Sequence, residues 1–221
     1  IDPSRRIYWG YLLTSLIIAI LVAVIRNPKP LNQHIRDLTQ RWKNPSILLD
    51  IKLLIINSLL RALLIAPIII PIGTVAVFTT ALMEKLLGSP AAHQWSSFQI
   101  GAAYTLTLFI LSDLSRYIVH RCFHEISALW QFHQVHHSAT DLTPMTLYRL
   151  HPIEIVILEV RRSLVIGLTS GFFLYWFRGD LNSFDMLGIN IFGFIFNLTG
   201  ANLRHSQTWL SYGSFFERFF I

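Results

Sequence analysis

Residues 113–137 read DLSRYIVHRCFHEISALWQFHQVHH and hold five of the nine histidines in this 221-residue chain. The five fall into two tight groups, HRCFH and HQVHH. Imidazole is the commonest metal ligand in proteins, and neutral histidine binds divalent transition metals well. Crowded histidines repel one another when protonated, and each buried neutral ring still needs hydrogen-bond partners. We therefore interpret this stretch as the centre of a histidine-rich metal site.

In the first group, His120 and His124 are four residues apart, so on a helix they project from one face and can share a metal. Asp113 and Tyr117 precede His120 by seven and three residues, which places them on the same stripe of the helix. A carboxylate such as Asp113 can orient a ligand histidine through its second ring N–H. The alternative is a local ion pair between Asp113 and Arg116, and the spacing leaves both interpretations open.

In the second group, His133 shares a helical face with both His136 and His137. The adjacent pair diverges by about 100° on a helix, so the two rings can serve different metals. Five histidines exceed what one tetrahedral zinc ion needs. A structural zinc site would also typically use cysteine, whereas Cys122 lies on a different helical face from His120 and His124. The spacing therefore favours two metals over one.

The composition is that of a chain in contact with lipid. It is 53% hydrophobic and only 14% charged, against about 25% charged residues in an ordinary soluble domain. Apolar stretches long enough for a hydrocarbon core of about 30 Å recur along the chain. They cover residues 7–25, 53–83 and 98–119, and Pro67 and Pro71 should break or bend the second. Residues 153–177 are also apolar, but the charged residues near their start should lie at the interface or outside lipid, and residues 184–200 form a shorter apolar segment. The sequence thus predicts an all-α fold, a polytopic membrane helical bundle.

The polar interval 27–52 predicts how the chain is oriented across the membrane. With Arg26 at its edge it holds six basic and two acidic residues, a net charge of +4, and short loops rich in lysine and arginine stay cytoplasmic. Counting spans from there puts both histidine groups on the cytoplasmic side, as a histidine-rich helical cap. A hairpin of residues 160–177 and 184–200 would return His205 to the same side, so we predict His205 as a ligand or a close neighbour. His151 is expected as a ligand or a hydrogen-bonding neighbour of one.

The sequence does not favour a carboxylate-bridged di-iron site, a zinc protease or a nucleic-acid-binding protein. No carboxylate lies at ligand spacing within the two groups, and HRCFH lacks the glutamate of the His-Glu-x-x-His protease signature. The net charge of +6 is not arranged as an aromatic-interleaved patch, so no nucleic acid partner is expected.

The order of apolar stretches and histidine groups along the chain also predicts its domains. Residues 1–112 are expected to form N-terminal transmembrane helices, and residues 113–221 are expected to form the catalytic region.

The pattern resembles the fatty acid hydroxylase / sterol desaturase superfamily of membrane enzymes. The residues that carry the resemblance are Asp113-Leu-Ser-Arg116-Tyr117, His120-x3-His124, Leu129-Trp130-x-Phe132-His133-x2-His136-His137-Ser138, Arg149-Leu-His151-Pro152 and Arg204-His205-Ser206. The resemblance implies a non-haem di-iron centre with His120, His124, His133, His136 and His137 as ligands. It also implies O₂ activation, electrons from a reductase, a ferredoxin or a cytochrome b5-type protein, and hydroxylation or desaturation of a sterol, sphingolipid or fatty-acyl lipid.

One departure from the family pattern concerns its third histidine box, His-x2-His-His, because no histidine follows His205. SYGSFFERFFI resembles the run-up to that box, so we expect that the sequence stops short of it and that this fragment alone is inactive. Two rival functions remain from the residues themselves. One is a zinc-binding membrane hydrolase, with zinc in place of iron, and the other is a transporter with a histidine proton relay.

Overall fold

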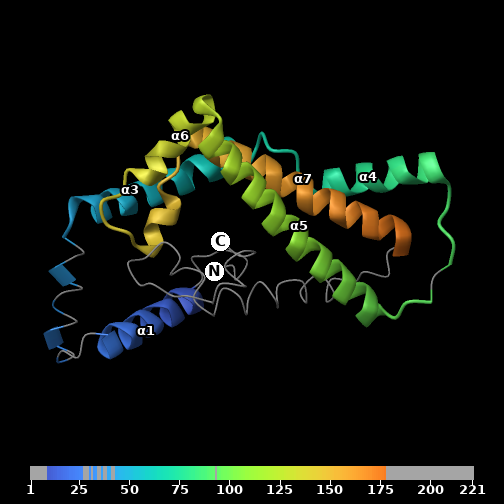
Figure 1. Cartoon of the computed structure of the whole chain (residues 1–221). Coiled ribbons are helices and arrows are strands. Elements are labelled where there is room, and N and C mark those ends of the chain that lie inside the picture. The colour runs from blue at the N-terminus through green and yellow to red at the C-terminus, as the bar shows by residue number, and fades with distance from the viewer. Residues whose placement is uncertain are drawn as a thin grey trace. The chain divides into compact units, whose positions relative to one another are not determined.

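The computed structural model describes residues 9–26, 30, 32, 33, 36, 39, 40, 43–92 and 94–177, and in this part of the chain every regular element is a helix (Figure 1). The elements are α1 (Trp9–Arg26), α3 (Pro45–Leu60), the π-helix η1 (Arg61–Ile65), α4 (Ile72–Leu87), α5 (Ser97–Glu125), α6 (Ser127–His137), the 3-10 helix η2 (Pro144–Tyr148) and α7 (Pro152–Phe177). The all-α prediction is confirmed for these residues.

The second apolar stretch is broken where its prolines predicted. Helical structure ends at Ile65 and resumes at Ile72, directly after Pro71. Proline has no backbone N–H and is unfavourable inside a helix, so the chain leaves the helix across this segment. The predicted break in this apolar stretch is confirmed, while its crossing of a membrane stays a prediction.

The polar interval before it is shorter than the sequence suggested. Asn44 caps α3, its side chain accepting a hydrogen bond from the backbone N–H of Ser46 at 2.9 Å, and Pro45 occupies the first turn. Both residues favour a helix start at this point. Asp50 and Lys52 therefore belong to a helix and not to the polar connection in which their charges were counted.

Helix α5 carries the first histidine group at its C-terminal end. It starts with a capping box formed by Ser96 and Gln99 and runs for 29 residues. Among the described residues, α5 is the one helix whose length and composition would let it cross a membrane. This finding agrees with a membrane protein, while the polytopic bundle stays a prediction.

The chain divides into two compact units. Of the described residues, unit 1 contains those up to Arg61 and Trp130–Pro152, and unit 2 contains Ala62–Leu129 and those from Ile153 onward. Each unit thus draws residues from both sides of the expected boundary at residue 112, and that boundary stays a prediction.

The core of unit 2 forms where α5 packs on α7. The buried residues Ile100, Tyr104, Leu108 and Phe173 make up one cluster. The ring of Tyr104 meets that of Phe173 edge-on with centroids 5.1 Å apart, and its hydroxyl is 2.6 Å from the hydroxyl of Ser170. A buried tyrosine is stable when its hydroxyl is partnered in this way.

Helix α7 also lies against α4, and two glycines allow the close approach (Figure 1). A Cβ atom at Gly167 would lie 2.5 Å from Val75 Cβ, and one at Gly171 would lie 2.5 Å from the carbonyl oxygen of Ala76. The Thr80 hydroxyl on α4 donates to the Gly171 carbonyl at 3.1 Å. Small residues four apart let helix backbones pack at short distance, as in membrane helix pairs.

We expect Gly171→Ala to lower the free energy of unfolding by about 1–3 kcal/mol, because the new methyl group has to displace α4 backbone. Gly73→Ala is the matched control, since a Cβ at Gly73 meets nothing within 4 Å and alanine is the better helix former by about 0.5–1 kcal/mol. Thermal unfolding of the purified variants measures both. Equal stability of the two variants would contradict the packing described here.

Candidate metal centre

The first histidine pair occupies the last turns of α5. The rings of His120 and His124 are 4.7 Å apart between centroids, and both residues are exposed. One turn of helix separates them, so the i, i+4 geometry expected from the sequence is realised. Upstream on this helix, Arg116 Nη1 lies 3.7 Å from Asp113 Oδ1, which is the local ion pair considered as the alternative for Asp113. Tyr117 is about half exposed on the same helix.

The second group occupies α6, and His133 is its buried member at 2% exposure. Nε2 of His133 lies 3.2 Å from Nε2 of His137. The rings of His133 and His136 stack with centroids 5.5 Å apart, whereas the His136 and His137 rings stand at 88° to each other. The angle between these two ring planes does not measure their separation around the helix axis, so service of two different metals by this pair stays a prediction.

Three of the predicted ligands form a group that can hold a metal ion. His120, His124 and His133 each offer one ligand nitrogen, and these atoms lie within 4.8 Å of one another. Helices α5 and α6 are joined through Ile126 alone, whose backbone is extended. A helix, a one-residue break and a second helix thus carry all five histidines of residues 113–137.

The donor atoms present fit a divalent transition metal. Two imidazole nitrogens that each lie about 2 Å from one metal ion are separated by about 3 Å, and the His133 and His137 nitrogens are 3.2 Å apart. A set made of imidazoles suits iron, zinc, copper and nickel better than the oxygen-seeking Mg²⁺ and Ca²⁺. The geometry alone therefore accepts both iron and zinc.

The remaining predicted residues are placed as follows. His151 immediately precedes α7, and its ring lies 4.9 Å from that of Phe132 on α6. This contact ties His151 to the histidine-bearing helix without assigning it to a metal. His205 lies outside the described residues.

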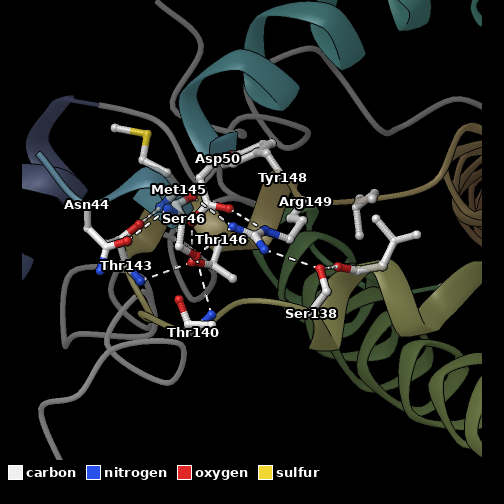
Figure 2. Close-up of polar contacts among 12 residues, drawn as sticks. Asn44, Ser46, Asp50, Ser138, Thr140, Thr143, Met145, Thr146, Tyr148 and Arg149 are labelled. Atoms are coloured by element: carbon white, nitrogen blue, oxygen red, sulfur yellow. Dashed lines mark hydrogen bonds and ion pairs between the residues drawn. The ribbon is translucent and has the colours of Figure 1, made fainter. Parts of the chain in front are cut away.

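Sequence reasoning missed the polar side of α3, which supports the chain between α6 and α7 (Figure 2). Ser46, Asp50 and Asn57 share one side of this apolar helix, and Asp50 and Asn57 are buried. The Asn57 side chain donates to the carbonyls of Tyr148 and Leu150, at 3.0 and 2.8 Å, and so fixes the backbone just before His151. Polar residues at helical spacing in an apolar helix were the signal that could have revealed them.

Arg149 is the residue that meets this side of α3. Its guanidinium forms an ion pair with Asp50 and hydrogen bonds with Ser46 on α3 and with Ser138, the residue after His137 (Figure 2). Thr146 in η2 donates to the second oxygen of Asp50 at 2.7 Å. The segment 138–149 is therefore anchored through charged and polar groups.

An exposed apolar stripe leads along α5 toward the first histidine pair. Ile110, Leu114 and Tyr117, at i, i+4 and i+7, are each about half exposed. They lie on the same side of the helix as His120 and His124. The arrangement can therefore hold a transition metal at the end of a surface suited to hydrocarbon.

Comparison with known proteins gives one family. A family model described as fatty acid hydroxylase matches residues 105–221, just over half of the chain, and the match includes all the predicted metal ligands and His151. No curated protein and no solved structure matches the chain.

Proposed function

Because this chain belongs to the fatty acid hydroxylase family, as its histidine motifs predicted, we propose that it is a membrane-bound oxygenase that hydroxylates or desaturates a lipid. The observation that carries the proposal is the group of His120, His124 and His133 nitrogens within 4.8 Å inside the matched segment. The family implies oxidoreductase activity, and one apolar helix, α5, agrees with a membrane location.

The proposed cofactor is a pair of iron ions held by His120, His124, His133, His136 and His137, with His205 as a further ligand. When bound, iron would supply the O₂ chemistry that no amino-acid side chain provides. In a hydroxylation one oxygen atom enters the C–H bond and the other leaves as water, which consumes two electrons and two protons. A reductase, a ferredoxin or a cytochrome b5-type protein is the proposed electron donor.

The protein's own residues would position the reactants. The histidines at the end of α5 and along α6 would hold the metals, and the exposed stripe of Ile110, Leu114 and Tyr117 would offer apolar contact to an alkyl chain. A site that faces the membrane from the cytoplasmic side of a multi-pass protein would receive such a chain directly from lipid. Burial of the alkyl chain against α5 would also keep bulk water away from the reacting carbon.

Lipid analysis tests the proposal. Cells that carry the full-length gene are compared, under O₂, with cells that lack it and with cells carrying His136→Ala. A lipid that gains a hydroxyl group or a double bond only with the intact gene is the expected result. An unchanged lipid profile in all three strains would overturn it.

Zinc is the alternative that the donor set also accepts, and with it a membrane hydrolase activity. We expect that removing metal from the purified protein with a chelator abolishes lipid oxidation, and that Fe²⁺ restores it while Zn²⁺ does not. Product formation and metal content per chain are measured before and after reconstitution. Activity restored by Zn²⁺ without any O₂ requirement would favour the hydrolase.

A further inference from the structure

A buried ion pair between Arg149 and Asp50 lies in unit 1 (Figure 2). Arg149 and Asp50 are 2% and 0% exposed, and Arg149 Nε donates to Asp50 Oδ1 at 2.5 Å. The second carboxylate oxygen accepts from the Thr146 hydroxyl at 2.7 Å. Both oxygens of Asp50 are thus partnered, as a buried carboxylate requires.

The same guanidinium reaches the end of α6. Arg149 Nη1 donates to the Ser138 hydroxyl oxygen at 3.2 Å, and the Ser138 hydroxyl donates in turn to the Val135 carbonyl at 2.7 Å. Val135 belongs to the last turn of α6, which carries His136 and His137. A chain of two hydrogen bonds therefore connects the buried ion pair to the turn that presents these histidines.

The third arm of the guanidinium holds α3. Arg149 Nη2 donates to the Ser46 carbonyl at 2.7 Å and to the Ser46 hydroxyl at 2.8 Å. The backbone N–H of Thr140 donates to the same hydroxyl at 3.3 Å. One planar side chain thus fixes the start of α3 and both ends of the segment 138–149 in a single geometry.

We propose that Asp50 and Arg149 are positioning residues of the metal centre, which hold the last turn of α6 so that His136 and His137 keep the orientation needed for metal binding. The inference rests on the proposed function of these histidines as ligands. Asp50 lies outside the segment matched by the family model, so α3 contributes to the site although the match begins at residue 105. Outer residues that orient ligands commonly change metal affinity about 10–100-fold when they are replaced.

Two substitutions separate positioning from general stability. Ser138→Ala removes the hydroxyl that links Arg149 to the Val135 carbonyl of α6. Ser138 is exposed, and its replacement leaves the buried ion pair of Arg149 and Asp50 intact. Arg149→Lys keeps a positive charge for Asp50, but an ammonium cannot reproduce the fork that reaches Ser138 and Ser46 together. Arg162→Lys is the matched control, because Arg162 is 47% exposed and pairs with Glu159 at 3.7 Å in unit 2.

The test uses the full-length protein purified in lipid nanodiscs. Iron per chain, the affinity for Co²⁺, the visible spectrum of the Co²⁺-loaded protein and the melting temperature are measured for each variant. We expect Ser138→Ala and Arg149→Lys to bind Co²⁺ at least about 10-fold more weakly, with a changed spectrum. Ser138→Ala should keep a melting temperature close to that of the parent, and Arg162→Lys should match the parent in every measurement.

Three results would overturn the inference. First, Ser138→Ala could bind Co²⁺ with the affinity and spectrum of the parent. The ion pair would then only stabilise the fold, and the proposed function would still stand because the parent binds metal. An equal loss of metal in Arg162→Lys would show that the effect is not specific to this network. A parent that binds neither iron nor Co²⁺ would refute the proposed function itself, and the positioning role with it.

Discussion

The His133→Ala variant is expected to lose lipid oxidation by more than about 100-fold, together with its iron. His133 is the buried histidine of the group, and its Nε2 lies 3.2 Å from that of His137. Replacing a residue that only orients a ligand already costs about 10–100-fold, so removal of a ligand itself should cost more. Product formed per chain and iron per chain, measured on the purified full-length protein, test the expectation.

Gln131→Ala provides the control for this experiment, because Gln131 is exposed on the same helix and alanine is an excellent helix former. It should keep both iron and product formation. If His133→Ala retained its iron and its activity, the assignment of α6 as a ligand-bearing helix would be wrong. Partial iron with no product would instead agree with two metals of unequal affinity.

The two histidine groups could be predicted from the sequence because the residues of each group are close together along the chain. His120 and His124 are one helical turn apart, and so are His133 and His137, so helical periodicity alone predicts which rings share a face. The family match confirms the resemblance drawn from the same residues. The all-α class followed from long apolar stretches, and the break before α4 from Pro67 and Pro71.

The supporting contacts were not accessible in the same way. Asp50 and Arg149 are 99 residues apart, and no periodicity links positions that meet only in the folded chain. Asp50 was counted among the charges of a polar connection, whereas the cap at Asn44 and Pro45 starts a helix five residues earlier. The contacts of Gly167 and Gly171 with α4 likewise depend on tertiary packing, because their spacing of four favours close helix packing but does not identify the partner helix.

The largest effect on stability is expected at Asp50. Asp50→Ala would leave the Arg149 guanidinium buried without its carboxylate, and the loss of one partner from a buried pair costs about 3–5 kcal/mol. Thr146 would lose its acceptor as well, since its hydroxyl donates to Asp50 Oδ2. Denaturant or thermal unfolding of the purified protein should show the loss as a lower free energy of unfolding.

Two comparisons assign this loss to the uncompensated charge. Glu125→Ala breaks the ion pair with Arg121, whose side chains are 60% and 59% exposed, and should cost less than about 1 kcal/mol, as exposed pairs do. The double variant Asp50→Leu with Arg149→Met removes both charges and should be more stable than Asp50→Ala, because an apolar pair leaves no buried ion behind. A cost for Asp50→Ala as small as that for Glu125→Ala would mean that water reaches the Arg149 charge, in contradiction to its burial. A guanidinium that water reaches would also not fix the geometry of the last turn of α6, because a solvated side chain does not keep a single position.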